Sequence, residues 1–77
     1  MAKRASKQIF VLCVKNDAYP ASLELRKIYR SLPDASAKAK GFVRVIDESG
    51  EDYLYPEGYF VAVNLSQAAV DALLAAS

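Results

Sequence analysis

The sequence predicts a mostly β domain with a helix at its C-terminus, and three stretches support that prediction. The first is a run of six apolar residues, IFVLCV at 9–14, which is rich in branched side chains and too short for a helix. The second is a pair of segments at 42–46 and 52–55 joined by the turn sequence Asp-Glu-Ser-Gly. The third is an alanine- and leucine-rich segment at 66–76 that begins with a capping serine, Ser66.

Residues 9–14 are apolar on both faces of an extended strand. This pattern is typical of a strand in the middle of a sheet that is covered on both sides. Cys13 lies in this strand, and because the chain has no histidine, we expect a buried small hydrophobic residue and not a reactive thiol. The segment KNDAYP at 15–20 is then a loop, as its Asn-Asp pair and its proline indicate.

The next segment, ASLELRKIYRSL, is ambiguous. Its apolar residues recur at intervals of three and four behind Ser22 as an N-cap, so periodicity alone favours a helix over 23–32 and an α+β fold. Alternation of apolar and polar residues over 27–32 supports a strand, but less strongly. The residues alone leave both assignments open.

Two short connections are easier to interpret. Residues 32–41 suit one or two helical turns, with Asp34 as the N-cap and Gly41 as the residue that ends them. Pro-Glu-Gly at 56–58 predicts a tight turn before another strand at 59–63.

The tip of the hairpin at 42–55 is rich in acids: Asp47, Glu48, Glu51 and Asp52. Without a bulge in the turn, Arg44 pairs with Tyr53 across the hairpin, whereas a bulge at Gly50 would shift this register. The acids lack the spacing of a calcium loop. We therefore expect solvated carboxylates that keep the tip soluble, and a substitution Glu48→Gln that is nearly silent.

The length of 77 residues predicts one domain at 9–77, preceded by a flexible basic arm at 1–8. The apolar run at 9–14 is too short for a signal peptide or a membrane span, and a single cysteine has no internal disulfide partner. These features predict a cytoplasmic protein that does not associate with membranes. We expect it to be a monomer or a weak dimer.

Charge is divided unevenly along the chain. The first 45 residues hold all ten Lys and Arg with three acids, and the remaining residues hold six acids and no base. A basic first half with tyrosines predicts one alternative function, which is weak, sequence-indifferent nucleic-acid binding through Arg26, Lys27 and Arg30.

Catalysis has little support in the sequence. The chain has no histidine, a lone cysteine in an apolar strand and no glycine-rich phosphate loop. We therefore expect no enzymatic activity, no cofactor and no metal site.

Three stretches resemble a family of short uncharacterised bacterial proteins with an SH3-like barrel: NDAYPASLELRKIYRSLPD at 16–34, RVIDESGEDYLYP at 44–56 and YFVAVNL at 59–65. Within them, SLELRKIYRSLPD is similar to the segment of bacterial SH3-like barrels in which a leucine anchors a diverging turn and a Lys-x-Tyr strand follows. YPEGYFVAV looks like the end of an SH3 barrel, where a proline and a tyrosine flank a one-turn helix. The resemblance implies a small barrel of about five strands, with a strand and not a helix before residue 32, and it implies no activity.

On this resemblance, Tyr55, Pro56 and Tyr59 occupy the region in which SH3 domains form their peptide groove. The chain lacks the tryptophan and the Ala-Leu-Tyr-Asp-Tyr motif of eukaryotic SH3 domains, so only the barrel is carried over. We expect a non-enzymatic protein-interaction or regulatory module that contacts an unknown protein partner through Tyr53, Tyr55, Pro56 and Tyr59.

Overall fold

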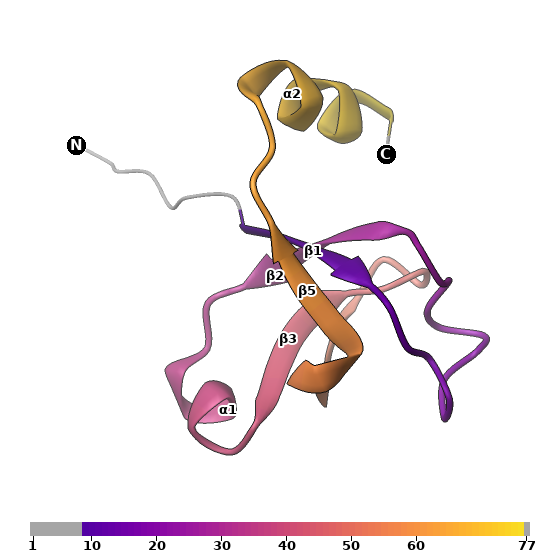
Figure 1. Ribbon diagram of the computed structural model, residues 1–77, viewed down its shortest axis with the longest axis vertical. Coiled ribbons are helices and arrows are strands. Elements are labelled where there is room, and N and C mark those ends of the chain that lie inside the picture. Colours follow the sequence, from indigo (N-terminus) through magenta and orange to yellow (C-terminus); the bar gives the residue numbers. More distant parts are fainter. Residues whose placement is uncertain (1–8, 77) are drawn as a thin grey trace.

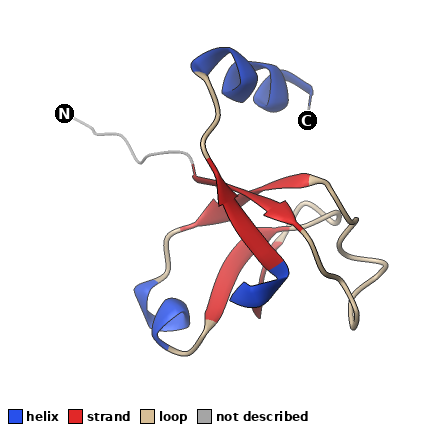
Figure 2. Ribbon diagram, in the orientation of Figure 1, coloured by secondary structure: helices blue, strands red, loops and turns tan. Residues whose placement is uncertain are grey.

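The computed structural model describes residues 9–76, which form a small β-rich domain with a helix at its C-terminus (Figures 1 and 2). The elements in chain order are β1 (Ile9–Cys13), β2 (Ile28–Leu32), α1 (Ala35–Ala39), β3 (Phe42–Ile46), β4 (Asp52–Pro56), the 3-10 turn η1 (Glu57–Tyr59), β5 (Phe60–Val63) and α2 (Gln67–Ala76). The five strands make one antiparallel sheet in the order β4-β3-β2-β1-β5. The predicted mostly β fold is confirmed, while the predicted arm at 1–8 lies outside the described residues.

Strand β1 occupies the inner position that its sequence predicts. It pairs with β2 on one side and with β5 on the other. Phe10 and Val11 are adjacent in the chain and point to opposite faces, yet both are buried, so the strand is covered on both sides. Cys13 is completely buried, as expected for a small hydrophobic residue.

The alternative of a helix over 23–32 is wrong, because only the last five residues are regular and they form β2. Leu23 is completely buried in the core, and Arg26 has φ of 66°, outside the right-handed helical region. The amide of Arg26 donates to the carbonyl of Cys13 at 2.8 Å, and the amide of Cys13 donates to the carbonyl of Lys27 at 2.9 Å. Pairing with the end of β1 thus replaces the hydrogen bonds that a helix would have made.

Helix α1 has the ends that its sequence predicts. The carboxylate of Asp34 accepts a hydrogen bond from the amide of Ala37 at 3.0 Å, so Asp34 is the N-cap. The helix ends at Ala39 with Lys40 as its C-cap, and Gly41 follows with φ of 82°, a conformation that glycine adopts without strain.

The β3–β4 hairpin has the bulged register and not the simple one. Gly50 has φ of 85°, and the loop between the paired residues Ile46 and Asp52 is one residue longer than the predicted turn. Arg44 therefore pairs with Leu54 and not with Tyr53. Because side chains alternate along a strand, this shift of one residue turns Tyr55 towards the core.

The core contains two tyrosines among its apolar residues. Its buried cluster comprises Val11, Cys13, Leu23, Tyr29, Val45 and Tyr55. Three partly buried residues pack against it, namely Val43, Tyr59 and Phe60. Since a buried phenol must find a hydrogen-bond partner, the fold has to supply polar groups at the edge of this cluster.

Helix α2 begins at Gln67, directly after the predicted cap Ser66, and lies at the top of Figure 1. The hydroxyl of Ser66 accepts a hydrogen bond from the amide of Ala69 at 3.1 Å, so Ser66 caps the helix. None of the described residues of α2 is buried. No helix within residues 9–76 is long and apolar enough to cross a membrane.

Candidate interaction surface

The structure places the four predicted contact residues on β4 and η1 with very different exposure. Tyr53 is 51% exposed, whereas Tyr55 is only 3% exposed and belongs to the core. Pro56 and Tyr59 are half-buried at the junction between β4 and η1. Tyr53, Pro56 and Tyr59 are therefore at least partly exposed and Tyr55 is not, and no ring contact joins Tyr53 to the other tyrosines within residues 9–76.

A fifth residue, Tyr19 in the loop after β1, joins this group. Its ring lies edge-on to that of Tyr55, with centroids 4.9 Å apart, and 6.2 Å from the ring of Tyr59. The sequence pattern did not group Tyr19 with these residues, although its Tyr-Pro pair repeats the Tyr-Pro pair at Tyr55. We define the tyrosine surface as Tyr19, Tyr53, Pro56 and Tyr59.

The hydroxyl of Tyr55 is anchored to the hairpin loop. It donates a hydrogen bond to the carboxylate of Asp47, which is itself buried at 6% exposure. That carboxylate also accepts from the amide of Ser49 at 2.9 Å and from its hydroxyl at 2.6 Å. Burial opposes ionisation, but the hydrogen bonds from Ser49 and Tyr55 outweigh it and lower the pKa of Asp47. Burial and the neighbouring carboxylate raise the pKa of Tyr55 to about 12.

Glu48 makes a second link between this loop and the core. It forms a salt bridge with Lys27 at 2.6 Å and accepts a hydrogen bond from the hydroxyl of Tyr29. Lys27 first and Tyr29 second lower the pKa of Glu48. The hydroxyl of Tyr29 in turn accepts from the amide of Glu24 at 2.8 Å.

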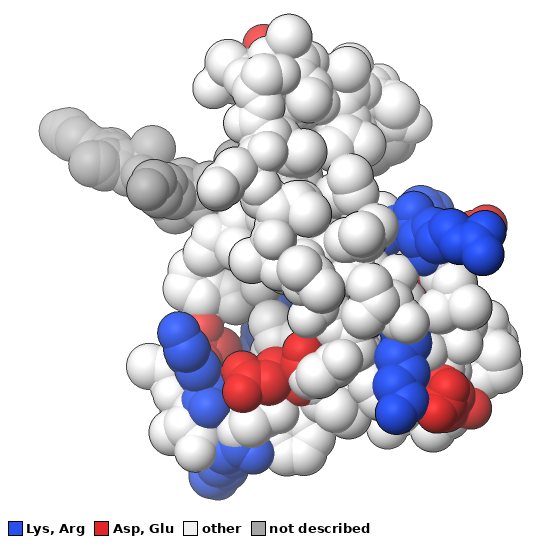
Figure 3. Space-filling model, viewed as in Figure 1, with Lys and Arg blue, Asp and Glu red and all other residues white. Residues whose placement is uncertain are grey.

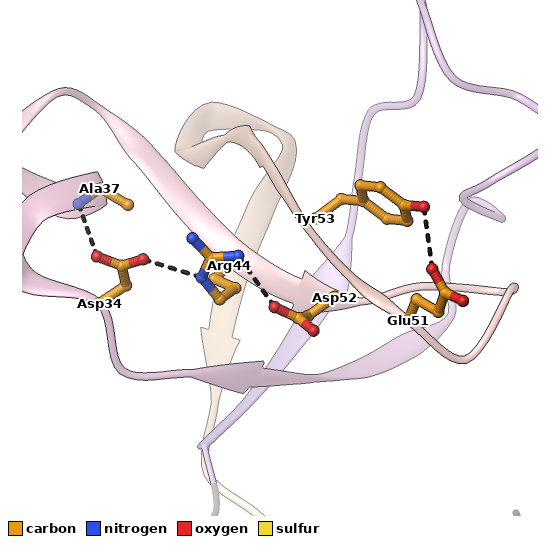
Figure 4. A network of polar contacts seen from close by, with 6 residues as sticks. All are labelled: Asp34, Ala37, Arg44, Glu51, Asp52 and Tyr53. Atoms are coloured by element: carbon orange, nitrogen blue, oxygen red, sulfur yellow. Dashed lines mark hydrogen bonds and ion pairs between the residues drawn. The ribbon is translucent and has the colours of Figure 1, made fainter.

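These contacts correct the expectation that the acids at the hairpin tip are merely solvated. Asp47 and Glu48 satisfy the hydroxyls of the two core tyrosines. Asp52 is paired with Arg44, whose guanidinium also binds Asp34, at 2.9 Å in each case (Figure 4). Glu51 accepts a hydrogen bond from the exposed hydroxyl of Tyr53 at 3.1 Å. The carboxylates have structural partners that the sequence pattern did not reveal.

The residues of the nucleic-acid alternative are not equally available. Lys27 is paired with Glu48 and lies 5.5 Å from the centre of the Tyr29 ring. Arg26 in the loop and Arg30 on β2 form no ion pair within the described part of the chain. On the face seen in Figure 3, basic and acidic side chains lie next to one another, and α2 is almost free of charge.

Metal-binding clusters and reactive thiols are the other kinds of functional group to consider. Residues 9–76 contain no cluster of three or more His, Cys, Asp or Glu residues that could hold a metal ion. The thiol of Cys13 donates a hydrogen bond to the carbonyl of Lys15 at 3.4 Å, and burial raises the pKa of this thiol.

Comparison of the chain with protein-family models, with curated proteins and with solved structures finds no match.

Proposed function

We propose that this domain is a non-enzymatic protein-interaction module and that its tyrosine surface contacts a protein partner. The observation that supports this most strongly is that the ring of Tyr19 packs against the rings of both Tyr55 and Tyr59, and that the hydroxyl of Tyr55 is fixed by Asp47. Aromatic rings held in one arrangement lose little conformational entropy when they bind. Tyrosine is also among the residues that most often dominate the binding energy of protein interfaces.

We also propose that the five strands form an SH3-like barrel. Two features support this beyond the resemblance in sequence. Leu23 is fully buried within the long connection between β1 and β2, and η1 lies between β4 and β5 next to Pro56. In this proposal the tyrosine surface lies where SH3 domains bind extended peptides, and the lone buried thiol of Cys13 suits a cytoplasmic protein.

The test is to compare the double variant Tyr19→Ala/Tyr53→Ala with the wild type for binding a partner captured from native lysate and then purified. We expect the affinity to fall by about tenfold or more, because two exposed rings of the interface are lost. Val61→Ala is a matched control, since Val61 is 52% exposed on β5 and lies outside the tyrosine surface.

Amide NMR spectra verify that each variant is folded. Unchanged affinity in a folded double variant would exclude the tyrosine surface as the contact site. Binding to single-stranded oligonucleotides is measured in parallel against salt concentration, because nucleic-acid affinity falls steeply with salt. Micromolar oligonucleotide binding at physiological salt that Arg26→Gln/Arg30→Gln abolishes would favour the nucleic-acid alternative.

A further inference from the structure

An open cleft with a volume of about 490 Å³ lies between α1 and the strands β1, β2, β3 and β5. Its walls are mainly apolar and include Val11, Leu32, Val43, Phe60 and Ala62. None of its lining residues belongs to the tyrosine surface. Its volume and apolar walls are those of sites that bind small molecules.

One polar group that lines the cleft is buried and has no hydrogen-bond partner among residues 9–76. This group is the hydroxyl of Ser31, a residue that is only 6% exposed. Asp47, the other buried polar residue in this range, receives hydrogen bonds from both Ser49 and Tyr55. Buried hydroxyls are nearly always hydrogen-bonded, because an unsatisfied one costs free energy. A group that enters the cleft can supply the missing partner.

The charges around the cleft balance one another. Asp34 and Arg44 are paired at 2.9 Å, and the remaining charged lining residues are one base, Lys38, and one acid, Glu57. A ligand with a net charge gains no complementary field from such a lining, whereas a neutral ligand avoids the large cost of dehydrating a charge.

We propose that this cleft binds a neutral small molecule with an apolar body and one hydrogen-bonding group that reaches the hydroxyl of Ser31. This site is separate from the proposed protein-binding surface and does not depend on it.

Four probes of similar shape test the proposal on the full chain by amide NMR titration: benzyl alcohol, toluene, benzoate and benzylammonium. We expect benzyl alcohol to give saturable shifts at millimolar concentration in Ser31, Val43, Phe60 and Ala62. The two charged probes should bind at least about fivefold more weakly, because each must lose more hydration. No saturation by benzyl alcohol, or shifts located away from these residues, would overturn the proposal.

Two variants separate the contribution of the Ser31 hydroxyl to binding from that of the apolar walls. Ser31→Ala should weaken benzyl alcohol by about three- to tenfold and leave toluene unchanged, as expected for the loss of one neutral hydrogen bond. If Ser31→Ala leaves benzyl alcohol unchanged, the hydroxyl is satisfied by water only and the proposal is wrong. Ala62 is an exposed residue of β5 at the edge of the cleft, so Ala62→Leu fills part of the cleft. This variant should abolish binding of both probes in a folded protein. Unchanged binding to Ala62→Leu would place the probes elsewhere and contradict the proposal.

Discussion

The carboxylate of Asp47 shows how much one residue contributes to this small fold. It accepts hydrogen bonds from the amide and hydroxyl of Ser49 within the loop and from the hydroxyl of Tyr55 in the core. It thereby joins the tip of the hairpin to the ring on which Tyr19 packs. Glu48 plays a similar part towards Tyr29 and Lys27, so the expectation that Glu48→Gln is nearly silent no longer holds.

Asp47→Ala should lower the free energy of unfolding by about 1–3 kcal/mol, because the buried hydroxyl of Tyr55 and the amide of Ser49 both lose their acceptor. Glu51→Ala is the matched control: it removes the same charge from the same loop, but the carboxylate of Glu51 is exposed and accepts only from the exposed hydroxyl of Tyr53. The control should change the free energy of unfolding by less than about 0.5 kcal/mol. Urea unfolding measures both, and equal losses would show that the effect is one of loop charge and not of buried hydrogen bonds.

At the scale of elements, the sequence predicted what depends on neighbours in the chain. The apolar run of β1, the Asp34 cap of α1 and the Pro-Glu-Gly turn at η1 are local signals, and all three elements are present. The segment 23–32 could not be assigned from its period, because the burial of Leu23 depends on strands that are distant in sequence. Tertiary contacts decided against the helix there.

The register of the hairpin was also undecided, because it depends on the backbone of Gly50. A residue with φ of 85° allows the bulge, and the bulge decides that Tyr55 and not Leu54 is buried. The hydrogen bond from Tyr55 to Asp47 follows from this register, so no pattern of acids predicted it. Tyr19 was not placed beside Tyr55 and Tyr59 for a related reason: its ring contacts join a loop to β4 and η1, which are distant in the sequence.

Gly50→Ala should destabilise the domain by about 1–2 kcal/mol, since a left-handed backbone brings Cβ too close to its own carbonyl. Gly58→Ala is an unusually direct control. A Cβ at either glycine meets nothing within 4 Å, but only Gly50 of these two has positive φ. Gly58→Ala should therefore be neutral or slightly stabilising. Thermal unfolding of the two variants gives the comparison, and a loss at Gly58 as large as that at Gly50 would contradict the role of φ.

At the scale of the whole molecule, folding mixes the two oppositely charged halves of the sequence. Lys27 and Arg44 come from the basic half, and they pair with Glu48 and Asp52 from the acidic half. The uneven charge along the chain is therefore a poor guide to the charge of any one surface. The first of these pairs joins two loops and the second joins β3 to β4, so ionised carboxylates contribute to the stability of the domain.

The stability of the domain should therefore fall in acid. Three carboxyl groups have lowered pKa values in the folded state: Asp34 through the amide of Ala37 and then Arg44, Asp47 through Ser49 and Tyr55 against its burial, and Glu48 through Lys27 and Tyr29. The ordinary values of these groups are 3.8 for aspartate and 4.5 for glutamate. Below these values the unfolded chain binds more protons than the folded one, so acid favours unfolding.

The melting temperature should consequently be nearly constant from about pH 7 to pH 5 and should decrease as the pH falls below about 4.5. Asp47→Asn should make this decrease shallower, because the variant has one fewer carboxylate with a lowered pKa. Glu57→Gln, at an exposed acid whose carboxylate has no hydrogen bond or salt bridge within residues 9–76, should leave this decrease unchanged. Thermal unfolding followed by circular dichroism from pH 7 to pH 2.5 measures all three proteins. A melting temperature that stays constant or rises in acid would mean that these carboxylates do not stabilise the folded chain, and equal profiles for wild type and Asp47→Asn would remove Asp47 from the explanation.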